Sequence, residues 1–190
     1  MPAEETIYLI PGFMSPAWML YPLERALRKP GRTIVRWDYP QVLTDPYRTV
    51  DALCEEMVRS AAPSVSIVGH SFGDWIARMA INQSQLPTIR KLISICPVVA
   101  PVPFASVFSP VLGKLIPELV IMNDRELSSS PLSSTTQARR SIIWAKVELI
   151  VARPEGLAVD HEIWGAHISC VFQPNLWRIV EQELSTSGDS

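Results

Sequence analysis

The chain of 190 residues is 47% hydrophobic and carries a net charge of −2, which fits one domain with a sizeable buried core. It has no acidic or basic block, so it lacks the usual electrostatic signature of a protein that binds nucleic acid or an anionic membrane. The first residues, MPAEET, lack the basic and then apolar pattern of a signal peptide, so we expect a cytoplasmic protein.

The cysteines are odd in number and widely spaced, and each lies in an apolar pattern: Cys54, Cys96 and Cys170. We therefore expect three buried free thiols rather than disulfides. No CxxC, HExxH or comparable spacing occurs in the sequence, so we expect neither a metal ion nor a cofactor. The sequence carries no signal for a particular oligomeric state.

The first sixty residues alternate between short apolar runs and amphipathic stretches. Residues 6–10 (TIYLI) are fully apolar, as expected for a buried parallel strand. A stripe of leucines predicts a helix over 16–28, and apolar spacing of three and four predicts another over 49–61. A second strand is predicted between them, over 33–38.

The most informative stretch is 64–74 (SVSIVGHSFGD), in which a β-branched run leads into Gly-His-Ser-Phe-Gly and then into an apolar-periodic segment. This is G-x-S-x-G in the order strand, sharp turn, helix, which presents the serine hydroxyl at the end of the strand. The motif therefore indicates that Ser71 is a nucleophile. We interpret His70 as a packing residue, and Asp74 as a structural carboxylate in the first turn of the helix.

The second half of the chain predicts strands over 89–96, 146–152 and 161–165 and a closing helix over 174–184, with 185–190 as a disordered tail. Residues 97–122 are almost uncharged but contain five prolines, which break any helix long enough to span a membrane. This run is either an apolar cap over the serine or an irregular segment packed on the sheet.

The serine motif, together with Gly-Ala-His-Ile-Ser at 165–169 ahead of the final helix, resembles the α/β-hydrolase family, in particular its small bacterial lipases and esterases. The resemblance implies a single α/β domain over 1–190. Its sheet would be mostly parallel, with about six strands flanked by helices, and a cap or insertion would occupy 97–145 between the fourth and fifth strands. The antiparallel strands that open larger hydrolases are missing.

The resemblance also implies a histidine base after the last strand, where His167 stands. His161 is the alternative, and His70 is excluded because a direct neighbour in sequence rarely has the geometry to serve as the base for Ser71.

The family places its acid after the fifth strand. If that strand is 146–152, the acid is Glu155, with Asp160 as its rival and Asp124 as a more distant candidate. Glu155 departs from the usual Asp, and only twelve residues would separate it from His167.

Two backbone N–H groups would form the oxyanion hole, those of Phe13 and Phe72. Met14 and four residues of the apolar run would line the acyl pocket: Phe104, Val107, Phe108 and Leu112. These features predict a serine hydrolase that cleaves carboxylic esters of a fatty or other apolar acyl group through an acyl-enzyme, with a small ester or lipid-like molecule as its partner. The alternatives are an acyltransferase with the same triad and a catalytically silent binding protein.

Overall fold

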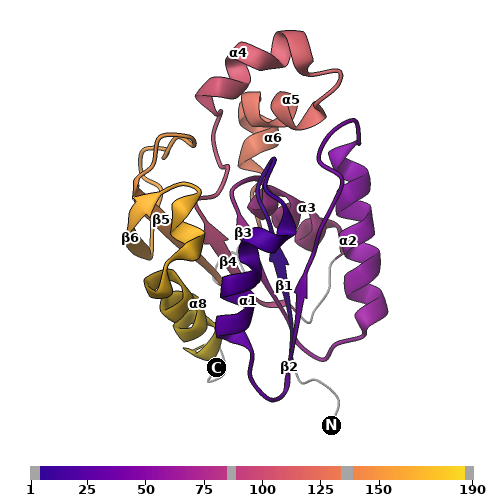
Figure 1. Cartoon of the computed structure of the whole chain (residues 1–190). Helices are drawn as coiled ribbons and strands as arrows, with labels where there is room; N and C mark the ends of the chain where they lie inside the picture. Colours follow the sequence, from indigo (N-terminus) through magenta and orange to yellow (C-terminus); the bar gives the residue numbers. More distant parts are fainter. Residues whose placement is uncertain (1–4, 85–88, 134–138, 187–190) are drawn as a thin grey trace.

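The computed structural model describes residues 5–84, 89–133 and 139–186 and shows a six-stranded parallel sheet in the order β2-β1-β3-β4-β5-β6 (Figure 1). Each neighbouring pair of strands is parallel, so the carboxyl ends of all strands meet at one edge of the sheet. The strands are β1 (Glu5–Ile10), β2 (Arg32–Arg36), β3 (Val65–His70), β4 (Ile89–Ile95), β5 (Arg140–Val147) and β6 (His161–Ala166).

Helices cover both faces of the sheet, as predicted for alternating strands and helices. On one face α1 contacts α8, and on the other α2 contacts α3 (Figure 1). The bounds of these elements are η1 (Ala17–Leu20), α1 (Tyr21–Leu27), α2 (Pro46–Ser60), α3 (Phe72–Ser84), η2 (Ser169–Phe172) and α8 (Pro174–Thr186). The strands β1 and β3 are buried at every residue, in agreement with their largely apolar sequences.

Three short helices follow β4 and lie above the carboxyl edge of the sheet, at the top of Figure 1. They are α4 (Pro103–Leu112), α5 (Pro117–Asn123) and α6 (Arg125–Ser129), and we call residues 97–133 the cap. Both interpretations of this run hold in part. The side chains near its base are buried in the core, whereas several apolar side chains of α4 and the turn after it are exposed.

A buried ion network joins the base of the cap to the sheet. Asp74 lies between the guanidinium groups of Arg78, 2.8 Å away, and Arg140, 3.0 Å away. The structural role predicted for Asp74 is therefore confirmed. Arg78 also donates to backbone carbonyls of the cap, those of Val98, Ser128, Ser129 and Ser130. Removing one partner of such a buried network leaves an uncompensated charge.

The fifth strand lies six residues earlier than the sequence pattern predicts. β5 spans Arg140–Val147, and the predicted strand over 146–152 is mostly loop, in which Leu149 is 87% exposed. The strand is central, between β4 and β6, so its buried part is the two-sided run Ser141–Ala145. The insertion between β4 and β5 consequently ends before residue 140 rather than at 145.

The closing helix extends to Thr186, beyond its predicted end, and the remainder of the predicted tail lies outside the described residues. The three cysteines are buried free thiols, as expected. Within the described ranges, no helix combines the length and the apolar character needed to cross a membrane.

Candidate active site

Ser71 lies at the turn between β3 and α3 in a left-handed backbone conformation, with φ of 54°. Its N–H donates to the carbonyl of Ile95 at the end of the next strand, over 2.9 Å, which holds the strained turn against the sheet. The flanking glycines are required by close packing. A Cβ at Gly69 would lie 2.6 Å from the Cα of Asp74, and one at Gly73 would lie 2.5 Å from the carbonyl oxygen of Ile10.

His167 follows β6 and is hydrogen-bonded to a carboxylate that the sequence analysis did not consider. Its Nδ1 lies 2.7 Å from Oε2 of Glu148, the residue directly after β5. A carboxylate can only accept, so Nδ1 carries the hydrogen and Nε2 is left with its lone pair. Oε1 of Glu148 accepts from the N–H groups of Ile150, at 2.8 Å, and Val151, at 3.0 Å. Both oxygens of this carboxylate are therefore engaged.

The pKa values of His167 and Glu148 shift in the directions that favour the charged form of each group. Burial opposes the charge on His167, but hydrogen bonds with Cys96 and Glu148 outweigh burial and raise its pKa above the ordinary value. Burial likewise opposes the charge on Glu148. The hydrogen bond and charge of His167, with the two backbone N–H groups, outweigh it and lower the pKa of this carboxyl. An imidazolium formed at His167 would therefore be stabilised.

Cys96 approaches the pair closely enough that one ligand atom from each of Cys96, Glu148 and His167 lies within 4.8 Å of the others. A metal ion would need the thiolate and a free imidazole nitrogen. A hydrogen bond with Cys170 and burial raise the pKa of the Cys96 thiol, and Nδ1 of His167 already donates to Glu148. The cluster therefore fits a hydrogen-bonded histidine–carboxylate pair better than a metal site.

The acids predicted from the sequence are not next to His167. Glu155 is exposed, and no hydrogen bond or ion pair joins it to His167 in the part of the chain that the structure describes. The carboxylate of Asp160 accepts from the N–H of Ile142, over 2.7 Å, near the start of β5. Asp124 caps α6. His167 is bonded to Glu148 instead, and Glu155 was expected as the acid because the fifth strand was expected over 146–152.

The alternative base, His161, is also far from this arrangement in the fold. It begins β6, at the opposite end of the strand from His167, and its Nε2 lies 2.7 Å from Glu183 of α8.

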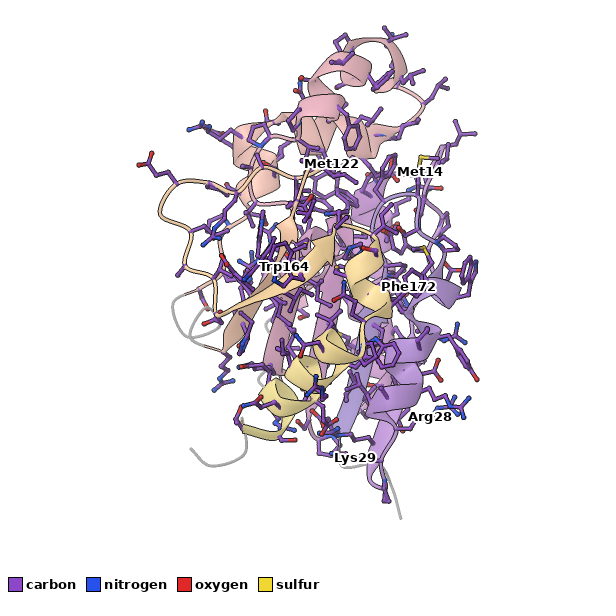
Figure 2. The ribbon with its side chains drawn as sticks, turned by 60° about the vertical axis from the view of Figure 1, so that its left-hand side comes forward. Met14, Arg28, Lys29, Met122, Trp164 and Phe172 are labelled. Atoms are coloured by element: carbon purple, nitrogen blue, oxygen red, sulfur yellow. The ribbon has the colours of Figure 1, made fainter. Side chains whose placement is uncertain are left out.

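Ser71 and His167 line one pocket of about 220 Å³ beneath the cap. Met14 reaches it from the loop after β1 and Met122 from α5, and Figure 2 shows both above the sheet. Its walls are almost entirely apolar; the remaining lining residues are Phe13, Ser15, His70, Val102, Phe104, Ile150, Val151 and Ile168.

Two of the five predicted pocket residues, Met14 and Phe104, line the pocket. Val107, Phe108 and Leu112 do not. α4 turns Val107 and Phe108 toward solvent, where they are 67% and 50% exposed, while Leu112 packs partly against the core. The sequence pattern could not decide this because α4 is apolar on nearly every face.

The predicted oxyanion residues flank the serine. Phe72 is the first residue of α3, directly after Ser71. Phe13 lines the pocket, and the residue before it packs tightly on the elbow, since a Cβ at Gly12 would lie 2.9 Å from the Cβ of Ser71. This close approach brings the loop after β1 next to the serine.

Comparison with known proteins agrees with this fold. The chain is 13% identical to a carboxylesterase structure from the ammonia-oxidizing thaumarchaeon Nitrososphaera gargenis (TM-score 0.69, covering 97% of this chain and 91% of that one). It is 15% identical to a lipase-esterase related protein from Clostridium acetobutylicum (TM-score 0.60, 97% and 94%). It is 13% identical to the type II thioesterase BorB of the borrelidin biosynthetic cluster (TM-score 0.64, 97% and 94%).

At these identities the structures show a shared fold alone. No curated protein matches the sequence. The profile of the alpha/beta hydrolase family, however, matches residues 7–171, which is most of the chain and includes the serine turn, Glu148 and His167. The protein therefore belongs to the alpha/beta hydrolase family.

Proposed function

We propose that the protein is a serine hydrolase that cleaves carboxylic esters of a short apolar acyl group through an acyl-enzyme. The observation that carries this proposal is the shared pocket of Ser71 and His167, with Glu148 bonded to the far nitrogen of the imidazole. Ser71 is then the nucleophile, His167 the base and Glu148 the acid. The order of these residues along the chain is the order found in this family.

In this proposal the hydroxyl of Ser71 attacks the ester carbonyl while Nε2 of His167 takes its proton. The imidazolium then returns that proton to the departing alkoxide, which leaves as an alcohol. Water attacks the acyl-enzyme by the same route and releases the acid. Glu148 fixes the tautomer through Nδ1–H and stabilises the imidazolium, which agrees with the raised pKa of His167.

The negative charge on the carbonyl oxygen needs donors that are already in place. We assign these donors to the backbone N–H groups of Phe13 and Phe72. The first lies in the loop held against Ser71 by Gly12, and the second begins α3, where the helix dipole favours an anion.

The pocket indicates the class of acyl group. A volume of about 220 Å³ lies below the range of about 300–1,000 Å³ that is typical of small-molecule sites, which favours a small acyl group. No Lys, Arg, Asp or Glu lines it, so a charged substrate would lose its hydration without gaining a partner. A short neutral acyl chain fits both observations. The names of the Nitrososphaera and Clostridium proteins support an ester as substrate.

The test compares the wild type with Ser71→Ala, using p-nitrophenyl esters from acetyl to dodecanoyl and a fluorophosphonate probe. We expect the wild type to prefer short chains and to be labelled. Ser71→Ala should lose labelling and lower kcat by about 10⁴-fold or more, as loss of a nucleophile does in serine hydrolases.

A wild type that neither hydrolyses an ester nor reacts with the probe would contradict the proposal and favour a silent binding protein. Transesterified product on addition of a primary alcohol, in excess over hydrolysis, would assign acyl transfer instead.

A further inference from the structure

His70, the last residue of β3, reaches from the serine turn to the chain segment that carries His167. Its side chain is buried, and its Nε2 lies 2.9 Å from the backbone carbonyl oxygen of His167. The two imidazole rings are in contact, with centroids 4.9 Å apart and an angle of 43° between their planes. The strand that presents the nucleophile is therefore bonded directly to the backbone of the proposed base.

The partner fixes the protonation of His70. A carbonyl oxygen only accepts, so Nε2 of His70 carries a hydrogen and donates it. Burial lowers the pKa of His70, which keeps the ring neutral, with a lone pair on Nδ1. This neutrality matters because an imidazolium forms on the adjacent ring during the proposed reaction, and a second positive charge there would oppose it.

The carbonyl of His167 accepts from two donors. Besides His70, the thiol of Cys170 donates to it over 3.1 Å, from within the short helix η2 that follows. The thiol bond is local, three residues along the chain, and a thiol is a weak donor. The bond from His70 joins residues that are 97 apart in the sequence, and it links the segment that carries His167 to the serine turn.

We propose that His70 is a positioning residue, whose Nε2–H holds the backbone of His167 so that the imidazole faces Ser71. The inference rests on the proposed function, since it concerns the geometry of the same base and nucleophile. It differs from the role of packing residue predicted from the sequence. If His70 only packed against its neighbours, activity would depend on its ring and not on its N–H donor.

Three variants separate the donor from the ring. His70→Phe keeps an aromatic ring and removes the donor. His70→Gln removes the ring but places an amide nitrogen near the position of Nε2. His70→Asn carries the same amide one methylene shorter, near the position of Nδ1, from which it cannot reach the carbonyl of His167. The Gln and Asn variants are therefore equally polar and differ only in whether the amide can reach the carbonyl of His167.

We expect His70→Phe and His70→Asn to lower kcat by about 10- to 100-fold with KM within about twofold, because a displacement near 1 Å costs on that scale. His70→Gln should stay within about threefold of the wild type. Thermal unfolding of each variant shows whether it is folded. Equal losses in the Gln and Asn variants, or a Phe variant as active as the wild type, would overturn the proposal.

Histidine ¹⁵N NMR of the wild type tests the bond without reference to activity. We expect His70 to show the Nε2–H tautomer and to titrate below the ordinary histidine value, in the direction of its lowered pKa. An Nδ1–H tautomer, or titration near the ordinary histidine value, would overturn the proposal. This readout tests the hydrogen bond of His70 even if the wild type hydrolyses no ester. A lack of ester hydrolysis would contradict the proposed function and not the bond.

Discussion

The side chains of Glu148, at the carboxyl edge of the sheet, and Glu118, in the cap, are both withdrawn from water, but they differ in their partners. Each oxygen of Glu148 accepts hydrogen bonds, one from His167 and the other from two backbone N–H groups. Glu118, in the first turn of α5, is 1% exposed, and its Oε2 has no hydrogen-bond partner among the described residues. The first pKa is lowered and the second is raised by burial to about 7.

The difference shows that burial alone does not determine how a carboxyl group behaves. Burial opposes ionisation at both sites, and only at Glu148 do partners outweigh it. At the carboxyl edge of the sheet, both oxygens of Glu148 are therefore satisfied by hydrogen bonds. The cap is packed at its base and contains a carboxyl group that is more stable neutral than ionised. The predictions below test this contrast.

The largest effect is expected at the carboxyl edge of the sheet, for Glu148→Gln. The amide can hold the imidazole of His167 in the wrong tautomer, so we expect kcat to fall by about 10⁴-fold. The base acts only when neutral, and its pKa is raised in the wild type. Activity should therefore fall as the pH decreases through a value above the ordinary histidine pKa. In Glu148→Gln that midpoint should move to lower pH.

Glu155→Gln and Asp160→Asn are the matched controls, since they make the same chemical change at the two acids suggested by sequence alone. We expect kcat near wild type in both, with a loss of about 1 kcal/mol in stability for Asp160→Asn, which weakens its bond to Ile142. A large loss of kcat at either control, with little loss at Glu148, would move the acid role away from Glu148.

The serine turn could be predicted from the sequence, whereas the carboxylate that bonds to His167 could not. The serine turn was predicted because strand, glycines and helix are contiguous, so local sterics determine the structure. The acid depends on where β5 ends, and two apolar runs competed for that strand. The run Ile142–Ala145 is buried at every residue, whereas the run over 146–152 is mostly exposed or half-buried and begins with two polar residues among its first three. Choosing the first run would have placed Glu148 three residues after it, at the end of the strand.

The partners of buried polar groups could not be predicted in the same way. His70 contacts a carbonyl 97 residues away, and Arg78 contacts carbonyls of the cap about fifty residues away. Such contacts depend on how elements pack, which periodicity does not encode. The mostly parallel sheet and the buried faces of the amphipathic helices were predictable because they follow from local patterns and from the alternation of strands and helices.

The second prediction concerns Glu118 in the cap. Its folded-state pKa is raised to about 7, so the folded protein retains a proton that the unfolded chain releases above the ordinary glutamate value. Stability should therefore fall as pH rises through this interval. Glu118→Gln removes the titration, and it should gain about 2–3 kcal/mol relative to the wild type between about pH 5 and pH 8. Urea unfolding at both pH values measures the gain.

Glu24→Gln provides the opposite case within the same residue type. Glu24 is also buried, but hydrogen bonds with Arg28 and Arg36 outweigh burial and lower its pKa. Its stabilising charge is present above the unfolded pKa and is lost only as pH falls below it. We expect Glu24→Gln to destabilise the protein equally at both pH values. A parallel response in the two glutamine variants would contradict the assignment of an unpaired carboxyl at Glu118.

The smallest effect is expected when side chains of α4 that line the pocket are compared with side chains of α4 that do not. Phe104→Ala enlarges the pocket, whereas Val107→Ala and Val111→Ala truncate side chains that are exposed on the same helix. The ratio of kcat/KM for octanoyl and butanoyl esters should rise by about 10-fold in Phe104→Ala, since methylene-scale changes in fit correspond to about 1–3 kcal/mol. It should not change in the two valine variants.

The ratio is the decisive quantity because it does not depend on the fraction of protein that is folded. Phe104 packs partly against the core, so its truncation also lowers stability and would reduce activity toward every ester equally. Such a loss cancels when two esters are compared in one preparation. An unchanged ratio in Phe104→Ala would mean that the acyl chain does not reach α4. A shifted ratio in Val107→Ala would mean that the cap closes over the substrate in a different orientation and brings its exposed face inward.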